Sequence, residues 1–173
     1  MRERAAAGKI VLAYMDEVGF AQAHPNRSAW TPRGSEHRHL IEAKRGKRLN
    51  VLGALLSSGE FFCARLWQTL TADLFVGWLG LLKEHVGTSL TVILDNAPIH
   101  TAKKILPFIE LLKSQGVTLY FLPPYSPELN RIEKLWHKIK YTWMELKCRT
   151  AETLEADVAH ILDNFGGEYK LRF

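Results

Sequence analysis

Three acidic residues in this sequence stand where chemistry on a phosphate-containing substrate is possible. Asp16 and Asp95 each follow a short apolar run of strand character, at residues 9–15 and 90–94. Glu133 lies at the edge of the apolar stripe of a predicted helix. Open sheets place their sites outside the carboxyl ends of parallel strands. If the two strands were parallel neighbours, both aspartates would share one rim, and the helix would bring Glu133 beside them.

Three converging carboxylates would bind a divalent cation. Mg²⁺, with Mn²⁺ as its substitute, takes a few carboxylate oxygens and keeps its remaining positions for water and substrate phosphate. Two such ions about 4 Å apart would activate an attacking oxygen and stabilise the leaving one during phosphodiester displacement. The chain carries 23 Lys and Arg against 18 Asp and Glu, a net charge of +5, which favours a polyanionic partner. Nucleic acid is therefore the expected substrate.

Length and composition limit the class of protein. With 173 residues, 47% of them hydrophobic, the chain is predicted to form one globular domain over residues 1–173. Cys63 and Cys148 have no spacing typical of a disulfide framework or a zinc site. The first residues lack a signal peptide's apolar run, and no stretch approaches the roughly 20 apolar residues of a membrane span. A cytoplasmic protein without a membrane partner is expected.

Apolar periodicity predicts the elements that must position the acids. Between the second and third strands, SSGE is typical of a hairpin turn. The predicted strands span residues 9–16, 49–56, 61–67, 90–94 and 117–122. The predicted helices span residues 71–85, 101–115, a long segment after PPYSP, and a short segment around 154–162. In the long helix, Ser126 is the expected cap, and one apolar stripe is formed by Leu129, Ile132, Leu135, Trp136, Ile139, Trp143 and Leu146.

The second acid also has an ordinary structural interpretation. Asp95, Asn96 and Pro98 taken alone are a helix-start signal. His100 lies about one turn further on, where it either orients water or a phosphate near the rim or is a plain surface histidine. Both interpretations of His100 stay open, and Asn96 is kept as a supporting candidate.

The first and third acids have similar alternatives. Glu133 and His137 form an i, i+4 pair that is typical of a solvated helix face. Glu17, next to Asp16, is either part of a strand-to-turn boundary or a weak supporting candidate. Only the three acids considered together favour a catalytic site.

Three sequence blocks carry a resemblance to a known family. YMDE at residues 14–17, LDNAPIH at 94–100 and LPPYSPELNRIEKLW at 122–136 resemble the signature blocks of DDE transposases of the mariner-like and related bacterial insertion-sequence group. The resemblance covers about residues 9–147. It implies an α/β, ribonuclease-H-like fold with a mixed five-stranded sheet flanked by helices. The catalytic and metal-binding triad that it implies is Asp16, Asp95 and Glu133.

The resemblance also implies a reaction and its partners. The reaction is cut-and-paste transposition, in which metal-activated water hydrolyses a phosphodiester at the element's end and the freed 3′ hydroxyl attacks target DNA. The implied partners are double-stranded DNA at transposon ends and target, two Mg²⁺ ions, and a second copy in an active homodimer. The implied location is the bacterial cytoplasm, associated with the nucleoid. Two alternatives are a catalytically inactive DNA-binding or protein-interaction remnant and a ribonuclease-H-like nuclease acting on RNA:DNA hybrids.

The sequence departs from the family pattern in two ways. Arg131 replaces the proline of the usual Asn-Pro-Ile-Glu wording, which a helix tolerates and which adds a candidate phosphate contact. The helix-turn-helix modules that usually precede the catalytic domain are expected to be absent. Basic residues near the predicted strands are further candidates for the DNA backbone, where each neutralised phosphate releases counterions; a solvated basic loop is the alternative. These candidates are Arg33, Lys44, Arg45, Lys47 and Arg48.

Overall fold

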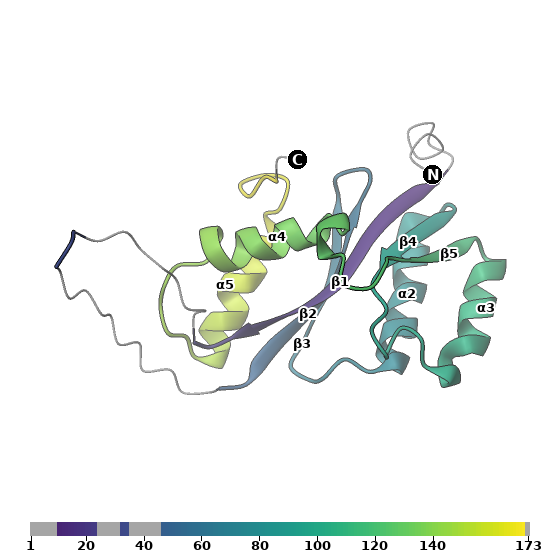
Figure 1. Ribbon diagram of the computed structural model, residues 1–173, viewed down its shortest axis with the longest axis horizontal. Coiled ribbons are helices and arrows are strands. Elements are labelled where there is room, and N and C mark those ends of the chain that lie inside the picture. The colour runs from purple at the N-terminus through teal and green to yellow at the C-terminus, as the bar shows by residue number, and fades with distance from the viewer. Residues whose placement is uncertain (1–9, 24–31, 35–45, 172–173) are drawn as a thin grey trace.

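The computed structural model describes residues 10–23, 32–34 and 46–171. A five-stranded sheet runs through this part of the chain, with its strands in the order β3-β2-β1-β4-β5 (Figure 1). β2 is antiparallel to β1 and β3, whereas β4 is parallel to β1 and β5. The predicted mixed sheet is confirmed, and the first and fourth strands are the parallel neighbours that a shared rim for the two aspartates requires. The strands are β1 (Val11–Ala21), β2 (Arg48–Leu56), β3 (Phe61–Leu66), β4 (Leu90–Leu94) and β5 (Val117–Phe121).

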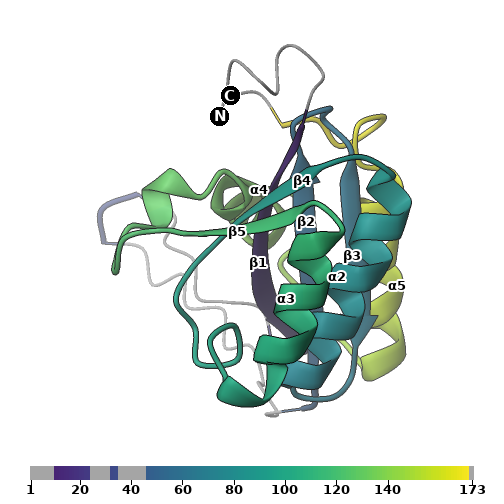
Figure 2. The ribbon, with the colours of Figure 1, turned by 90° about the vertical axis from the view of Figure 1, so that its right-hand side faces the viewer.

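Helices cover both faces of this sheet (Figures 1 and 2). Side chains alternate along β1, so Met15 packs in one core with α2 and α3, whereas Tyr14 packs in a second core with α4 and α5. We call the side of the sheet that carries Tyr14 the α4 face. Within the described residues, no helix is long and apolar enough to cross a bilayer. The helices are α2 (Ala72–Val86), α3 (Leu106–Ser114), α4 (Ile132–Lys138) and α5 (Ala151–Asp163).

The helix α2 begins and ends where local signals predict. The Thr71 side chain accepts a hydrogen bond from the backbone N–H of Leu74, and Gly87 closes the helix in the left-handed conformation with φ of 69°. The predicted helix 71–85 is thus confirmed. Leu81 in this helix is exposed.

The first strand is longer than predicted. The prediction ended it at Asp16, whereas β1 continues to Ala21. β4 pairs with β1 only as far as Tyr14, but β2 pairs with it throughout residues 13–21. Residues 17–21 therefore remain in the sheet through one neighbour alone, and Asp16 lies within a strand rather than at its end.

The long helix predicted after PPYSP is interrupted. A 3₁₀ turn at Pro127–Leu129 precedes α4, and a π-helical turn at Ile139–Trp143 follows it. Ser126 does not cap the helix; its hydroxyl donates to the carbonyl of Pro124. The break occurs because Asn130 is extended, with φ of −91° and ψ of 107°, and its side chain bonds to β1. Leu129 and Leu146, at the two ends of the predicted stripe, are consequently exposed, whereas Ile132, Leu135, Trp136 and Ile139 are buried.

The helix predicted at residues 101–115 starts later than expected. A 3₁₀ turn at Lys103–Ile105 leads into α3. Pro107 lies in the first turn of α3, where its missing N–H would have no partner in the helix. It therefore starts the helix rather than kinking it.

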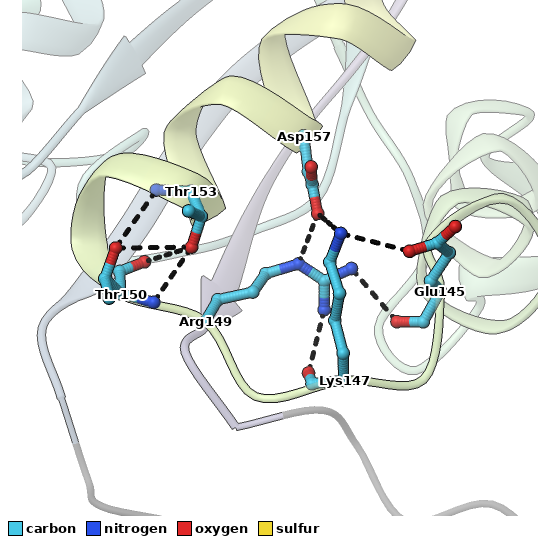
Figure 3. A network of polar contacts seen from close by, with 6 residues as sticks. All are labelled: Glu145, Lys147, Arg149, Thr150, Thr153 and Asp157. Carbon is cyan, nitrogen blue, oxygen red and sulfur yellow. Dashed lines mark hydrogen bonds and ion pairs between the residues drawn. The ribbon is translucent and has the colours of Figure 1, made fainter.

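A buried arginine fixes the segment that joins α4 to α5 (Figure 3). The Arg149 guanidinium donates to a carboxylate oxygen of Asp157 on α5 at 2.7 Å and to the carbonyls of Glu145 and Lys147 at 3.0 Å each. Thr150 then caps α5 in a reciprocal pair of hydrogen bonds with Thr153. The guanidinium joins two backbone carbonyls of the turn to a carboxylate of α5, so it locks α5 against the end of the α4 segment.

Candidate active site

The three acids lie around one cavity on the α4 face. Tyr14 pairs with Ile93 in the parallel ladder, and Asp16 and Asp95 lie two residues beyond them. Because side chains alternate with a period of two, Asp16 points to the same face as Tyr14, and Asp95, directly after the end of β4, lines the same cavity. Helix α4 crosses this face and brings Glu133 to the same cavity, which has a volume of about 410 Å³. The cavity is closed on another side by the 122–127 segment after β5.

The carboxylate of Asp16 is partly buried and lies near two other acids. Burial is the main cause that raises its pKa to about 7, and Glu133 and, to a smaller extent, Asp95 raise it further. The Trp136 indole N–H opposes this shift by donating to Asp16 Oδ2 at 3.1 Å. The pKa of Glu133 is also raised, mainly by burial and further by Asp95, with Lys140 opposing. Burial and repulsion between the acids therefore both disfavour the ionised forms of Asp16 and Glu133.

A glycine opposite Asp16 makes room for this tryptophan. Gly53 pairs with Asp16 across β1 and β2. A Cβ at Gly53 would lie 2.7 Å from the Phe61 ring and 2.8 Å from the Trp136 ring, well inside van der Waals contact. The two rings meet edge to face above this position. The absence of a side chain thus lets the indole lie against the sheet and reach the carboxylate.

We expect Gly53→Ala to displace Trp136 from Asp16. Overpacking of this kind costs about 1–3 kcal/mol, so the variant should unfold at a lower urea concentration than the parent chain. The intrinsic tryptophan fluorescence of the folded protein should change as well. Gly77→Ala is the matched control, since a Cβ there meets no atom within 4 Å and alanine favours a helix. Equal destabilisation by both substitutions would contradict the steric role of Gly53.

Asp95 is held by a buried histidine. His100 is only 3% exposed, and its Nδ1 lies 3.0 Å from a carboxylate oxygen of Asp95. Its ring packs against Phe75 with centroids 4.5 Å apart, and the Ala97 N–H donates to Asp95 Oδ1 at 3.1 Å. The surface alternative for His100 is therefore wrong. His100 orients the aspartate, while its Nε2 is buried with no hydrogen-bond partner among the described residues.

Two asparagines tie the loops of the site together. Asn96 donates to the carbonyl of Leu122 at 2.6 Å, which links the segment after β4 to the end of β5. Asn130 is buried and donates to the carbonyl of Met15 at 2.9 Å, which anchors the start of α4 beside Asp16. Sequence reasoning missed Asn130. The signal in the sequence for this role was the asparagine itself, a polar residue inside the segment that was predicted to be one continuous helix.

The side chain of Glu17 does not line this cavity, although its backbone forms a hydrogen bond that lowers the pKa of Asp16. Glu17 follows Asp16 in β1, so its side chain points to the opposite face. There it lines a second cavity of about 510 Å³ together with Lys47 and Arg48. The supporting role considered for the Glu17 side chain is therefore wrong, because successive side chains of a strand point to opposite faces.

The basic residues predicted to contact the DNA backbone lie in different parts of the chain. Lys44 and Arg45 lie outside the described residues, and Arg33 is exposed in the short described segment 32–34. Lys47 and Arg48 line the second cavity. Arg131 lies on the α4 face, with its guanidinium carbon 5.6 Å from the centroid of the Tyr14 ring.

Lys140, in the π-helical turn after α4, is a cation near the acids that the sequence did not single out. Its ammonium lies 5.8 Å from the centroid of the Phe20 ring. Burial and the nearby Arg48 lower the pKa of Lys140, while Glu133 and Asp16 raise it. Lys140 therefore belongs to the electrostatic surroundings of the acids.

The arrangement defines a class of protein. A mixed sheet in this strand order, with one acid on the central strand, one directly after its parallel neighbour and one on the helix after β5, is the ribonuclease-H-like core of enzymes that act on nucleic acid phosphodiesters. The chain belongs to the DDE superfamily endonucleases, whose family pattern matches residues 11–155.

Individual relatives agree with this assignment. The insertion element IS630 uncharacterized 39 kDa protein of Shigella sonnei is 25% identical over 166 residues, which cover 91% of this chain and 47% of that protein. The Mos1 transposase in a paired-end complex with its left transposon end has the same fold, with a TM-score of 0.72 and 18% identity over 97% of this chain and 52% of that chain. The catalytic core domain of BIV integrase matches with a TM-score of 0.50 and 15% identity, over 92% of this chain and 86% of that chain. The present chain spans about half the length of the first two proteins.

Proposed function

We propose that this chain is the catalytic domain of a transposase that hydrolyses DNA phosphodiesters at transposon ends and joins the freed ends to target DNA. The observation that carries the proposal is the convergence of Asp16, Asp95 and Glu133, from three separate elements, on one cavity. The family assignment and the likeness to the IS630 protein support it. The three acids are the proposed catalytic and metal-binding residues.

The residues of the cavity fit divalent cations such as Mg²⁺ or Mn²⁺. Carboxylate oxygens are the hard ligands that these ions prefer, and Mg²⁺ is usually held by one or two carboxylates with water and substrate phosphate in its remaining positions. Among the described residues no group of three or more His, Cys, Asp or Glu side chains is close enough together to hold one metal ion, so the proposed metal site rests on the lining of the cavity. The raised pKa of Asp16 is the expected state of such carboxylates without a counter-charge. A solved Mos1 paired-end complex was obtained with Mn and another with Mg.

The protein's own contribution to the reaction is positioning. Bound cations would supply the positive charge that activates the attacking oxygen and stabilises the leaving one. His100 and the Ala97 N–H fix the carboxylate of Asp95, and Trp136 fixes that of Asp16. Asn130 fixes the start of the helix that carries Glu133. Preorganised ligands of this kind avoid the cost of reorganisation during the reaction.

The proposed partners follow from the same site. Double-stranded DNA at transposon ends and target is the proposed substrate, with Arg131 on the α4 face as a candidate phosphate contact. The Mos1 transposase was solved as a paired-end complex, and for this chain we propose a homodimer in the active complex. Association with the bacterial nucleoid in the cytoplasm is part of the proposal.

Calorimetric titration with Mn²⁺ tests the metal site without any DNA. We expect the parent chain to bind Mn²⁺ and Asp95→Asn to lose at least about tenfold in affinity, because the variant removes a charged ligand while nearly preserving its shape. Asp163→Asn is the matched control, since Asp163 is a surface residue paired with Arg65. Equal heats from the parent and Asp95→Asn would favour an inactive DNA-binding remnant. Metal binding with cleavage of RNA:DNA hybrids but not of duplex DNA would favour a ribonuclease-H-like nuclease.

A further inference from the structure

One tyrosine beside the acids has an unfavourable backbone conformation. Tyr125 has φ of 55° and is the only non-glycine residue with positive φ among those that the structure describes. A side chain on Cβ makes this region costly, and for a bulky residue it is a genuine outlier. Such conformations persist where the surrounding structure enforces them, and they cluster at functional sites.

The surrounding loop enforces the position of Tyr125. Pro123 and Pro124 precede it and Pro127 follows it two residues later, and each proline fixes its own φ. Two hydrogen bonds tie the loop further, from Ser126 Oγ to the carbonyl of Pro124 and from Asn96 to the carbonyl of Leu122. Figure 2 shows the segment between β5 and α4 projecting beyond the sheet. The loop therefore presents the tyrosine at a defined place.

The ring of Tyr125 buries none of its surface in the domain. Its side chain is fully exposed, at 101%, although tyrosine usually buries its apolar body and leaves only the hydroxyl in water. Tyr125 nevertheless lines the same cavity as Asp16, Asp95 and Glu133. An exposed aromatic ring thus stands at the rim of the cavity in which the substrate phosphate is proposed to lie.

We propose that Tyr125 stacks on a nucleobase adjacent to the phosphate that the three acids hold. This inference rests on the proposed function. A base offers an apolar face of the same size as the phenol ring, and aromatic stacking on bases is tolerant of sequence. Inside a duplex both faces of a base are covered by its neighbours, so the stacked base is one at a strand end or in an unpaired stretch. Tyr125 is then a substrate contact that selects frayed or single-stranded DNA beside the cleavage point.

A protein partner fits these observations less well. An exposed aromatic ring on a rigid loop is also suited to a pocket on a second protein. Tyr125, however, stands at the rim of the cavity that the three acids line, and the polymer that carries the scissile phosphate has to pass this rim. Nucleic acid is therefore the occupant that the position favours.

A fluorescent base analogue tests the stacking directly. The probe is a DNA duplex with a short single-stranded 3′ extension and 2-aminopurine at the first unpaired position, titrated in Ca²⁺ so that the strand remains uncut. Stacking on an aromatic ring quenches 2-aminopurine. We expect the parent chain and Tyr125→Phe to quench the probe, and Tyr125→Ala to leave it bright and to bind about tenfold more weakly. With the same label placed inside the duplex, the difference between the parent chain and Tyr125→Ala should be small.

Two further variants separate stacking from stability. Tyr125→Gly removes the backbone strain along with the ring, so it should unfold no earlier than the parent chain and still fail to quench. Tyr141→Ala removes another exposed tyrosine, which lines a different cavity, and should behave as the parent. Equal quenching by the parent chain and Tyr125→Ala, or no quenching by the parent chain, would overturn the inference. Calorimetric Mn²⁺ binding needs neither Tyr125 nor DNA, so the proposed function is tested separately from the stacking of Tyr125.

Discussion

We expect Asp16→Asn, Asp95→Asn and Glu133→Gln each to reduce the proposed Mn²⁺-dependent nicking of supercoiled plasmid DNA by at least about a thousandfold, which corresponds to about 4 kcal/mol of transition-state stabilisation. Each substitution keeps the shape of the side chain and removes one negative charge from the cavity that all three acids line. The physical reason is that neutral amide oxygens hold divalent cations more weakly than carboxylates. Quantification of nicked and linear plasmid over time measures the effect.

Glu128→Gln is the control for the third acid. Glu128 lies in the same sequence block as Glu133 and is exposed in the 3₁₀ turn before α4. It is not part of the cavity lining, so its loss should leave the nicking rate within about twofold of the parent. If Glu128→Gln abolished nicking and Glu133→Gln did not, the third acid would be Glu128 and the proposed site would be wrong.

Asp16→Asn should also stabilise the metal-free protein at alkaline pH. The pKa of Asp16 is raised from 3.8 to about 7 in the folded chain, mainly by burial and then by Glu133. Between these two pH values the folded state binds a proton that the unfolded state has lost, so the stability of the parent falls as pH rises and levels off above pH 7. One pKa unit corresponds to about 1.4 kcal/mol, which makes the penalty a few kcal/mol at pH 8. The asparagine variant is free of this penalty, because it carries no charge and still accepts from Trp136.

Urea unfolding in EDTA at pH 5 and pH 8 measures this effect. The parent should lose stability between the two pH values and the variant should lose less, so that the variant is the more stable protein at pH 8. Adding Mn²⁺ should reverse the order, since bound cation stabilises only a chain that keeps the carboxylate. A variant that is less stable than the parent in EDTA at pH 8 would contradict burial and charge repulsion as the cause. Glu128→Gln again serves as the exposed control.

These two predictions share one physical origin. The folded chain holds Asp16 in a partly buried place beside Glu133 and Asp95, so burial and repulsion both make its ionised form costly, and a bound cation or a proton would relieve that cost. We therefore expect the loss of this acid to lower activity and to raise the stability of the metal-free protein, which is the trade-off expected of a preorganised site.

The sequence by itself determined the strands, most of the helices, the family and the three candidate acids. Strands and α2 follow from local apolar periodicity and from caps such as Thr71 and Gly87, which act over a few residues and are therefore readable along the chain. The parallel pairing of the strands that carry Asp16 and Asp95 was posed as a condition, and the structure satisfies it.

Only the tertiary structure decided how these residues act. The length of β1 depends on its pairing with β2, and the break before α4 depends on the bond from Asn130 to Met15, a partner 115 positions away. The burial of His100 against Phe75, the approach of Trp136 to Asp16 across Gly53 and the raised pKa of Asp16 likewise arise between elements that are distant in the chain. Local patterns fix which element forms, whereas packing, hydrogen bonding and charge depend on what the fold brings together, and no local pattern contains that information.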